Sequence, residues 1–309
     1  MLQKVPKQYL AQTRNIFHCN CKIKIPIEFS EELLERAFEV LEEIDLKYNS
    51  YVSGSYFSCI NENRGNWTPI DQDCVEMIRM IKKVSLITKG HYDITCMPLL
   101  QLWGFYKENN HSLPKKDELA TALEKVNFRS IAIEGLNVKI GAEQEIITGS
   151  FIKAFAVDKT IAFLKSHGVA DAIINAGGST ISSLNDASHT AWKINIPDAL
   201  SKDVFKTGLQ INSQTFSLSG SIDNNLLIDG KKYGHILDCI TGYPAENLQT
   251  GVLTKSAFLG DVLSTALFTV PATIRDEVIA ELKQHFDFDY FIIDNDHKKI
   301  VTECFQYLR

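Results

Sequence analysis

The sequence predicts an α+β fold, with a mixed α/β fold as the alternative, in a single domain of residues 1–309. Three observations indicate this class. Helical and strand-like patterns alternate irregularly, and no linker, low-complexity tract or internal repeat divides the chain. The composition is that of a globular protein, with 45% hydrophobic and 23% charged residues. A chain of this length can bury roughly 75% of its unfolded surface, so it can hold a large core.

The clearest predicted element is a helix that begins at about Ser30. Ser30 is a good N-cap, and Glu31 and Glu32 in the first turn suit the helix dipole. Apolar residues follow with a period near 3.6, at Leu33, Leu34, Phe38, Leu41 and Ile44. The other expected elements, in chain order, are a strand over 15–27, a polar loop over 47–70, a helix from about Gln72 to Thr88 that stops at Gly90, a hairpin about Gly135, a helix over 150–166 that ends at Gly168, a buried strand before Ala176, strands over 192–196, 205–211 and 214–218, helices over 259–268 and 274–285, and a final hairpin about Asn295-Asp296.

Charge and cysteine content exclude several classes of protein. The net charge is −6 with a pI near 5.8, and no basic stripe is present, so we expect no nucleic-acid partner. No stretch approaches the ~20 apolar residues that a membrane span needs. The start of the chain does not resemble a signal peptide. The seven cysteines are scattered and include no CxxC pair, so we expect free thiols and a cytoplasmic protein rather than a zinc site or a disulfide framework.

Asp261 and Thr265 form the first candidate site. They are four residues apart on a predicted helix, so their side chains face the same way. A carboxylate and a hydroxyl are suitable oxygen ligands for Mg²⁺, which also keeps water and phosphate oxygens in its shell. The competing structural explanation is that Asp261 supports the start of the helix while Thr265 bonds back to a carbonyl group.

Two further segments carry polar groups that suit phosphate chemistry. The Asp229-Gly230 turn leads into a strand that ends at His235, near Asp238, where a histidine can act as a base or a ligand. Ser150 precedes a helix whose free N–H groups favour an anion, and Lys153 lies in its first turn. A structural histidine and a solvated lysine are the competing explanations.

Two more segments could shape a ligand cavity. The aromatic run from Gly90 to Phe105 contains an aspartate and could hold a planar ring, although its aromatic residues could equally be core. The Gly177-Gly178 pair follows a buried strand and permits close approach of the backbone. It does not form GxGxxG, so no Rossmann fold is predicted.

Together and in this order, these segments resemble the ApbE-type flavin transferases, the FAD:protein FMN transferases. The similarity runs from about Ser50 to the C-terminus. Its most specific parts are Gly90 to Phe105, the helix start with Lys153, the Gly177-Gly178 pair, Ser219-Gly220-Ser221, His235 to Pro244, and Asp261 to Phe268; the loop Ser55 to Asn61 matches as well.

The resemblance implies a single ApbE-like, T-fold-like domain with mixed or antiparallel sheets and packed helices. It also implies an enzyme that uses Mg²⁺ to transfer FMN from FAD to a Ser or Thr hydroxyl of a target flavoprotein, with release of AMP. Asp261, Thr265 and the Ser150 carbonyl would hold the metal, and His235 would serve at the reacting phosphate. Contacts to the flavin nucleotide are implied for Tyr51, His91, Tyr92, Asp93, Lys153 and Ile236.

The sequence departs from the family pattern around the nucleotide. The family usually has a carboxylate where this chain has Ile147, and a glycine where it has Ala154. Its Met-Gly-Thr segment aligns with His18-Cys19-Asn20, and the aspartate that often follows the double glycine is Ser179. Two alternatives to the transferase therefore stay open. One is a non-catalytic or weakly active flavin-binding homologue, and the other is an FAD pyrophosphatase that yields FMN and AMP.

Overall fold

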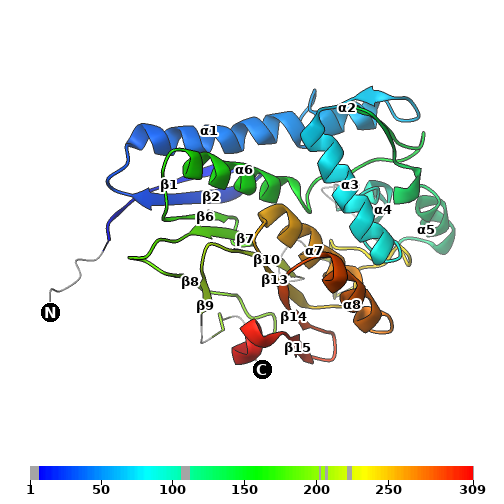
Figure 1. Ribbon diagram of the computed structural model, residues 1–309. Helices are drawn as coiled ribbons and strands as arrows, with labels where there is room; N and C mark the ends of the chain where they lie inside the picture. The colour runs from blue at the N-terminus through cyan, green and yellow to red at the C-terminus, as the bar shows by residue number, and fades with distance from the viewer. Residues whose placement is uncertain (1–6, 106–111, 202, 206–207, 221–224, 309) are drawn as a thin grey trace.

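The computed structural model in Figure 1 describes residues 7–105, 112–201, 203–205, 208–220 and 225–308. Its centre is one eight-stranded sheet in the order β1-β2-β6-β7-β10-β13-β14-β15, and every neighbouring pair in it is antiparallel. Strands from both ends of the chain therefore belong to the same sheet. Their bounds are β1 (Tyr9–Ile16), β2 (Cys19–Pro26), β6 (Ala172–Ala176), β7 (Thr180–Leu184), β10 (Thr215–Gly220), β13 (Gln249–Thr254), β14 (Asp289–Ile293) and β15 (Lys299–Val301).

Three helices cover one face of this sheet: α1 (Glu31–Tyr48), α6 (Ile152–Ser166) and α7 (Ala257–Thr269). The largest hydrophobic core lies beneath them and contains side chains such as Phe38, Phe151 and Leu263 that are fully buried. The remaining helices gather beyond one end of α1, or pack on α7 from outside (Figure 1). They are α2 (Tyr56–Glu62), α3 (Gln72–Ile87), α4 (Met97–Trp103), α5 (Lys116–Leu123) and α8 (Arg275–His285).

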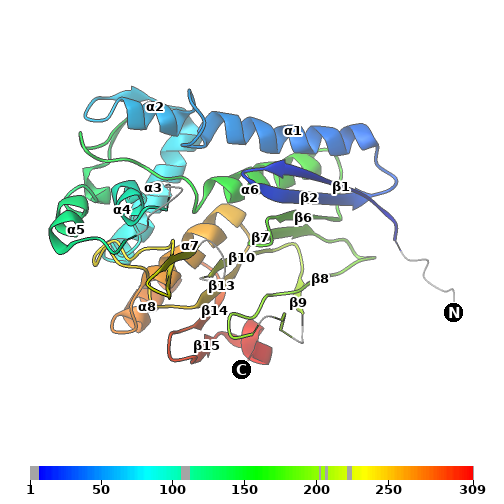
Figure 2. The ribbon, with the colours of Figure 1, turned by 180° about the vertical axis from the view of Figure 1, so that it is seen from behind.

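The opposite face of the sheet has its own covering. Figure 2 shows β8 (Trp192–Ile194) and β9 (Leu209–Ile211) on the side away from α1, together with a C-terminal 3₁₀ helix (Glu303–Leu308). A second core of Phe216, Phe291 and Phe305 lies there. Both faces are therefore buried, which explains why β7 and β13 lack the polar alternation of a one-sided sheet.

Two small sheets and a short 3₁₀ helix complete the structure. The strands β3 (Thr68–Pro69), β4 (Ala132–Glu134) and β5 (Asn137–Lys139) form one sheet, with the 3₁₀ helix (Phe128–Ser130) just before β4. The hairpin of β11 (Asn225–Ile228) and β12 (Lys231–Gly234) turns at Asp229-Gly230, both with positive φ. A third core joins residues of this hairpin, such as Leu226 and Ile228, to the apolar faces of α4 and α5.

Most expected helices are confirmed, and the N-caps explain where they begin. Ser30 accepts a hydrogen bond from the backbone N–H of Leu33 at 3.2 Å, and Asp71 accepts one from Cys74 at 2.9 Å. The segments 150–166, 259–268 and 274–285 are helical, as predicted. The hairpin about Gly135 and the turn at Asn295-Asp296 are also observed. Within the described residues, the helices are all too short or too polar to cross a bilayer.

Several sequence expectations were wrong. The single strand predicted over 15–27 is confirmed only as β2, because Phe17 and His18 both adopt positive φ and turn the chain, so that residues 15–16 belong to the preceding strand β1. The loop predicted over 47–70 contains α2, which Ser55 caps, and β3. The strand expected over 205–211 is observed only as β9, and Lys206 and Thr207 lie outside the described residues. Neither α4 nor α5 was predicted.

Candidate functional site

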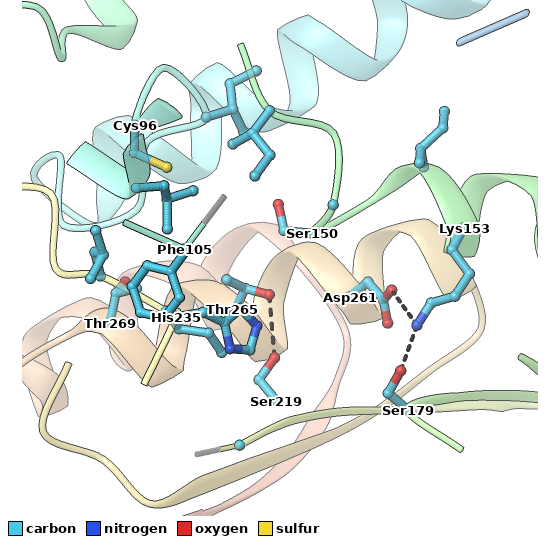
Figure 3. Close-up of a pocket in the computed structure, with 18 of the residues that line it drawn as sticks. Cys96, Phe105, Ser150, Lys153, Ser179, Ser219, His235, Asp261, Thr265 and Thr269 are labelled. Atoms are coloured by element: carbon cyan, nitrogen blue, oxygen red, sulfur yellow. Dashed lines mark hydrogen bonds and ion pairs between the residues drawn. The ribbon is translucent and has the colours of Figure 1, made fainter. Parts of the chain in front are cut away.

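A cavity of about 860 Å³ lies between α7, the start of α6, the β6–β7 turn and the segment after β12. Figure 3 shows part of its wall. All but one of the residues predicted for the site line it, although they come from segments far apart in the chain: Tyr51, Tyr92, Asp93, Ser150, Lys153, His235, Ile236, Asp261 and Thr265. Ser221 of the Ser219-Gly220-Ser221 motif is outside the described residues.

Asp261 presents a buried carboxylate to this cavity from α7. Both of its oxygens accept a hydrogen bond from the Thr180 hydroxyl, at 2.9 and 3.0 Å. Burial raises the pKa of Asp261, and the positive charge of Lys153 acts in the opposite direction. A carboxylate in such a place is stabilised by any cation that enters the cavity.

Thr265 lies one turn further along α7. Its hydroxyl is 3.2 Å from the Ser219 hydroxyl, which is in turn 2.9 Å from the hydroxyl of Ser264. Thr265 therefore belongs to a chain of hydroxyl groups at the cavity, and the predicted back-bond from Thr265 to a carbonyl is not among the hydrogen bonds of the described residues.

Two contacts fix α7 against its neighbours. A Cβ on Gly260 would lie 2.6 Å from the Ser217 hydroxyl and 2.9 Å from that of Thr254, so only glycine allows α7 to approach the sheet this closely. Asp158 on α6 accepts hydrogen bonds from the backbone N–H groups of Ala257 at 2.6 Å and Phe258 at 3.0 Å. Asp158 thus caps α7 and holds it to the helix that carries Lys153.

Lys153 reaches across the cavity towards α7 and β7. Its ammonium group is 2.5 Å from the Ser179 hydroxyl and 4.0 Å from an oxygen of Asp261 (Figure 3). Ser150, three residues earlier, is tied by its hydroxyl to the phenol of Tyr92 at 3.0 Å. The start of α6 therefore contributes a positive charge to the same space as the Asp261 carboxylate.

The run His91-Tyr92-Asp93 contributes less directly than the resemblance implied. His91 lies outside the cavity wall, and its Nδ1 is 2.7 Å from an oxygen of Asp238. The Asp93 carboxylate is occupied by the Thr95 N–H and hydroxyl, both at 2.8 Å, and by the Phe128 N–H at 2.6 Å. These two side chains support the wall, and their contact with a nucleotide stays a prediction.

The remaining predicted residues surround the opening and the far end. Tyr51 is 46% exposed, whereas His235 and Ile236 are half-buried directly after β12. The ring of His235 meets that of Phe105 edge to face, with centroids 6.4 Å apart. The sequence indicated the histidine through the Asp-Gly turn that precedes it.

Sequence reasoning missed some groups that the structure places here. Thr180 and Asp158 bind or orient the α7 residues, and Cys96 lines the cavity. A charged residue on the inner side of a helix was the available signal for Asp158. The close approach expected at Gly177 is confirmed, because a Cβ there would lie 3.0 Å from the Cys19 sulfur.

The oxygen groups at α7 suit a magnesium ion. Asp261 carries a carboxylate and Thr265 a hydroxyl, and Ser150, whose backbone carbonyl the resemblance implied as a third ligand, lines the same cavity. Within the described residues, no group of three or more His, Cys, Asp or Glu side chains could hold a metal. Mg²⁺ is commonly bound by one or two carboxylates together with substrate phosphates, so this donor set fits it better than it fits zinc.

The fold and the sequence as a whole match a known class of proteins. The model of the ApbE family matches residues 17–288, so the chain belongs to the ApbE family. Among curated relatives, a FAD:protein FMN transferase of Klebsiella pneumoniae (strain 342) is 24% identical, over 88% of this chain and 85% of that protein. One of Vibrio cholerae (serotype O1, strain ATCC 39541) is 26% identical, over 82% and 78%.

Solved structures agree on the fold. The ApbE protein of Thermotoga maritima aligns with a TM-score of 0.87 at 22% identity, over 97% of this chain and 98% of that one. The flavin transferase ApbE of Vibrio cholerae aligns with a TM-score of 0.80, also at 22% identity, over 97% and 99%. The α+β class that the sequence predicted is therefore confirmed.

Proposed function

We propose that this chain is an Mg²⁺-dependent FAD:protein FMN transferase. It would bind FAD, attach FMN to a Ser or Thr hydroxyl of a target flavoprotein and release AMP. One observation carries the proposal: Asp261, Thr265, Lys153 and His235 come from distant segments and line one cavity. The names of the curated relatives supply the reaction.

The transfer makes one bond and breaks one. The acceptor oxygen forms a bond to the phosphorus of the FMN half, the P–O bond of the pyrophosphate breaks, and AMP leaves. Mg²⁺, when bound by Asp261, Thr265 and the Ser150 carbonyl, would offset the charge on the phosphate groups. His235 would orient the incoming hydroxyl or accept its proton.

Lys153 and the cavity wall would bind the substrate. The ammonium group of Lys153, which already lies 4.0 Å from the Asp261 carboxylate, could bind a phosphate oxygen of FAD in the same way, because a phosphate is also an anion. Phe105, Ile147 and Ile236 offer apolar surface to the flavin or adenine ring. Tyr51 at the exposed side could cover whichever ring lies outermost.

Calorimetry with FAD, with and without Mg²⁺, is the first test, and we expect binding that Mg²⁺ strengthens. The second test mixes the protein with FAD, Mg²⁺ and a panel of flavoprotein domains. Flavin fluorescence that persists on a denaturing gel, with one AMP released for each adduct, supports the transferase. Mutation of the acceptor Ser or Thr to Ala is the control. Tight FAD binding without any adduct would contradict the proposal.

Ile147 favours the alternatives, because it places an apolar side chain in the cavity wall where the family resemblance implied a carboxylate. AMP release from FAD and Mg²⁺ without any acceptor would identify a pyrophosphatase. FAD binding with neither AMP nor an adduct would identify a flavin-binding homologue.

A further inference from the structure

Cys19 and Cys21 lie side by side where the cavity wall meets the main sheet. Their sulfur atoms are 3.8 Å apart, and they lie 3.4 and 3.7 Å from the same carbonyl oxygen, that of Ile16. Cys21 is fully buried, whereas Cys19 is half-buried. The two thiols therefore differ in access but are close enough to interact.

Cys19 can be reached from two sides. It lines the 860 Å³ cavity and also a neighbouring hollow of about 400 Å³, whose wall includes Lys22 and Gly178. Gly177 accounts for the space around the sulfur, because a Cβ there would lie 3.0 Å from it. A small polar molecule that enters either hollow therefore meets this thiol first and the Cys21 thiol behind it.

The contact with Cys21 and the charge of Lys153 favour the ionised form of Cys19. A hydrogen bond from Cys21 lowers the pKa of Cys19 to about 7, and the charge of Lys153 also lowers this pKa. Burial and the carboxylates of Asp261 and Asp45 raise it, but they do not cancel the decrease. The same hydrogen bond and burial raise the pKa of Cys21, so its proton stays in place. Cys304 is more exposed, but burial and Asp289 raise its pKa to about 11. If exposure decided the order of reaction, Cys304 would react first; if ionisation decided it, Cys19 would react first.

We propose that Cys19 and Cys21 form a thiol pair that hydrogen peroxide oxidises to a disulfide. The Cys19 sulfur attacks one peroxide oxygen, the O–O bond breaks, and a sulfenic acid and one water result. The Cys21 sulfur then attacks the Cys19 sulfur, the S–O bond breaks, and a second water leaves. The two sulfurs lose two electrons, which the peroxide gains.

The geometry makes this disulfide reversible. Bond formation brings the sulfurs from 3.8 Å to about 2.0 Å, within a ring that contains only Asn20 between the two cysteines. So small a ring is strained, and strained disulfides are readily reduced by thiols. Nothing in this step requires FAD or a metal, so the proposal stands independently of the transferase reaction.

The test uses the full chain, reduced and then exposed to a hydrogen peroxide series at pH 7. Remaining thiols are blocked with iodoacetamide, and peptide masses are read. We expect Cys19 and Cys21 to lose two hydrogens together at peroxide levels that leave Cys304 alkylated. Dithiothreitol should restore both thiols. Oxidation of Cys304 before Cys19, or a peptide in which both Cys19 and Cys21 remain alkylated, would overturn the proposal.

Variants separate the two steps. Cys21→Ser should stop at a sulfenic acid on Cys19, which dimedone traps, and Cys304→Ser should behave like the natural chain. Because Cys21 is buried, its variant is first checked by circular dichroism. If it does not fold, the rate of Cys19 alkylation in the natural chain replaces it: slower alkylation at Cys19 than at Cys304 at pH 7 would overturn the proposal.

Discussion

Ile147 stands where the family resemblance implies a carboxylate. Its side chain lines the cavity and also packs against the third core, and its backbone N–H donates to the Ile94 carbonyl at 2.8 Å. The backbone is therefore held in place whatever side chain it carries. Only the side chain decides whether this part of the wall can accept hydrogen bonds from a nucleotide.

Replacing Ile147 by Asp should tighten FAD binding. A carboxylate at the wall can accept hydrogen bonds from the nucleotide, and one such bond lowers the dissociation constant about tenfold. Calorimetry with Mg²⁺ present measures the change, and Ile147→Val is the matched control, expected to bind like the natural chain. An unchanged dissociation constant would mean that FAD does not contact this wall.

Replacing Asp261 by Asn should remove the metal-dependent reaction without unfolding the protein. Loss of the charged ligand should slow AMP release at least about 100-fold. Burial raises the pKa of Asp261, so its ionised form costs folding free energy above that pKa, and the neutral amide avoids the cost. The melting temperature at pH 7 should therefore be unchanged or higher. A fall in melting temperature with normal AMP release would show that Asp261 serves the fold instead.

The alkylation rate of Cys19 should follow its ionisation. Because the thiolate is the nucleophile and the pKa of Cys19 is lowered to about 7, the rate should rise with pH and reach half its maximum near pH 7. Cys304, with a pKa raised to about 11, should still be accelerating at pH 9. Iodoacetamide rates from peptide masses give both profiles in one experiment. Superimposed profiles would refute the difference in environment.

At the scale of elements, the joint between α6 and α7 sets the geometry of the site. The Asp158 carboxylate accepts hydrogen bonds from two backbone N–H groups at the start of α7, and a third from the Ser256 hydroxyl at 2.7 Å. Lys153 and Asp261 stand on the two helices that this residue joins. Their 4.0 Å separation therefore depends on a half-buried side chain that does not line the cavity.

Asp158→Ala should lower both stability and activity. The variant leaves N–H groups unpaired at a buried helix start, which should lower the free energy of unfolding by about 1–3 kcal/mol. Lys159→Ala is the control, because its pair with Asp73 is partly exposed and should cost at most about 1 kcal/mol. Urea unfolding measures both variants. Equal losses from the two would contradict the role given to Asp158.

Elements with strong local signals could be predicted from the sequence, and those fixed by tertiary contacts could not. The helix at Ser30 has a cap, an acidic first turn and an apolar period, so it was found. The α2 helix is only seven residues long, and it lies within a polar segment that the sequence predicts as a loop. The turn at Phe17-His18 has no glycine, asparagine or proline, so the sequence predicts one continuous strand where the β1–β2 hairpin turns.

The residues of the site also fall into those with a local sequence signal and those that only tertiary contacts bring together. Asp261 and Thr265 are a helical pair whose spacing is visible in one segment, whereas Thr180 joins them from a strand 81 positions away. His91 was expected at the nucleotide because it belongs to a characteristic run. Its ring contacts Asp238, which only the fold could show, and its contact with a nucleotide stays a prediction.

At the scale of the whole molecule, the eight-stranded sheet joins both ends of the chain into one domain. The β13–β14 and β2–β6 pairings each connect segments distant in sequence. We therefore expect a single unfolding transition, with circular dichroism and tryptophan fluorescence coincident in urea. Two separated transitions would contradict the single domain.

The strand order has a consequence for synthesis on the ribosome. The β1–β2 hairpin leaves the exit tunnel long before its partner β6, which begins only at Ala172, and α7 with Asp261 and Thr265 comes later still. The nascent chain must therefore carry the unpaired edge of β2 from the end of that strand at Pro26 until β6 begins at Ala172. Every product truncated before Ala257 lacks α7, and with it Asp261 and Thr265, the two side chains that we propose as metal ligands, so such a fragment should bind no Mg²⁺ at this site.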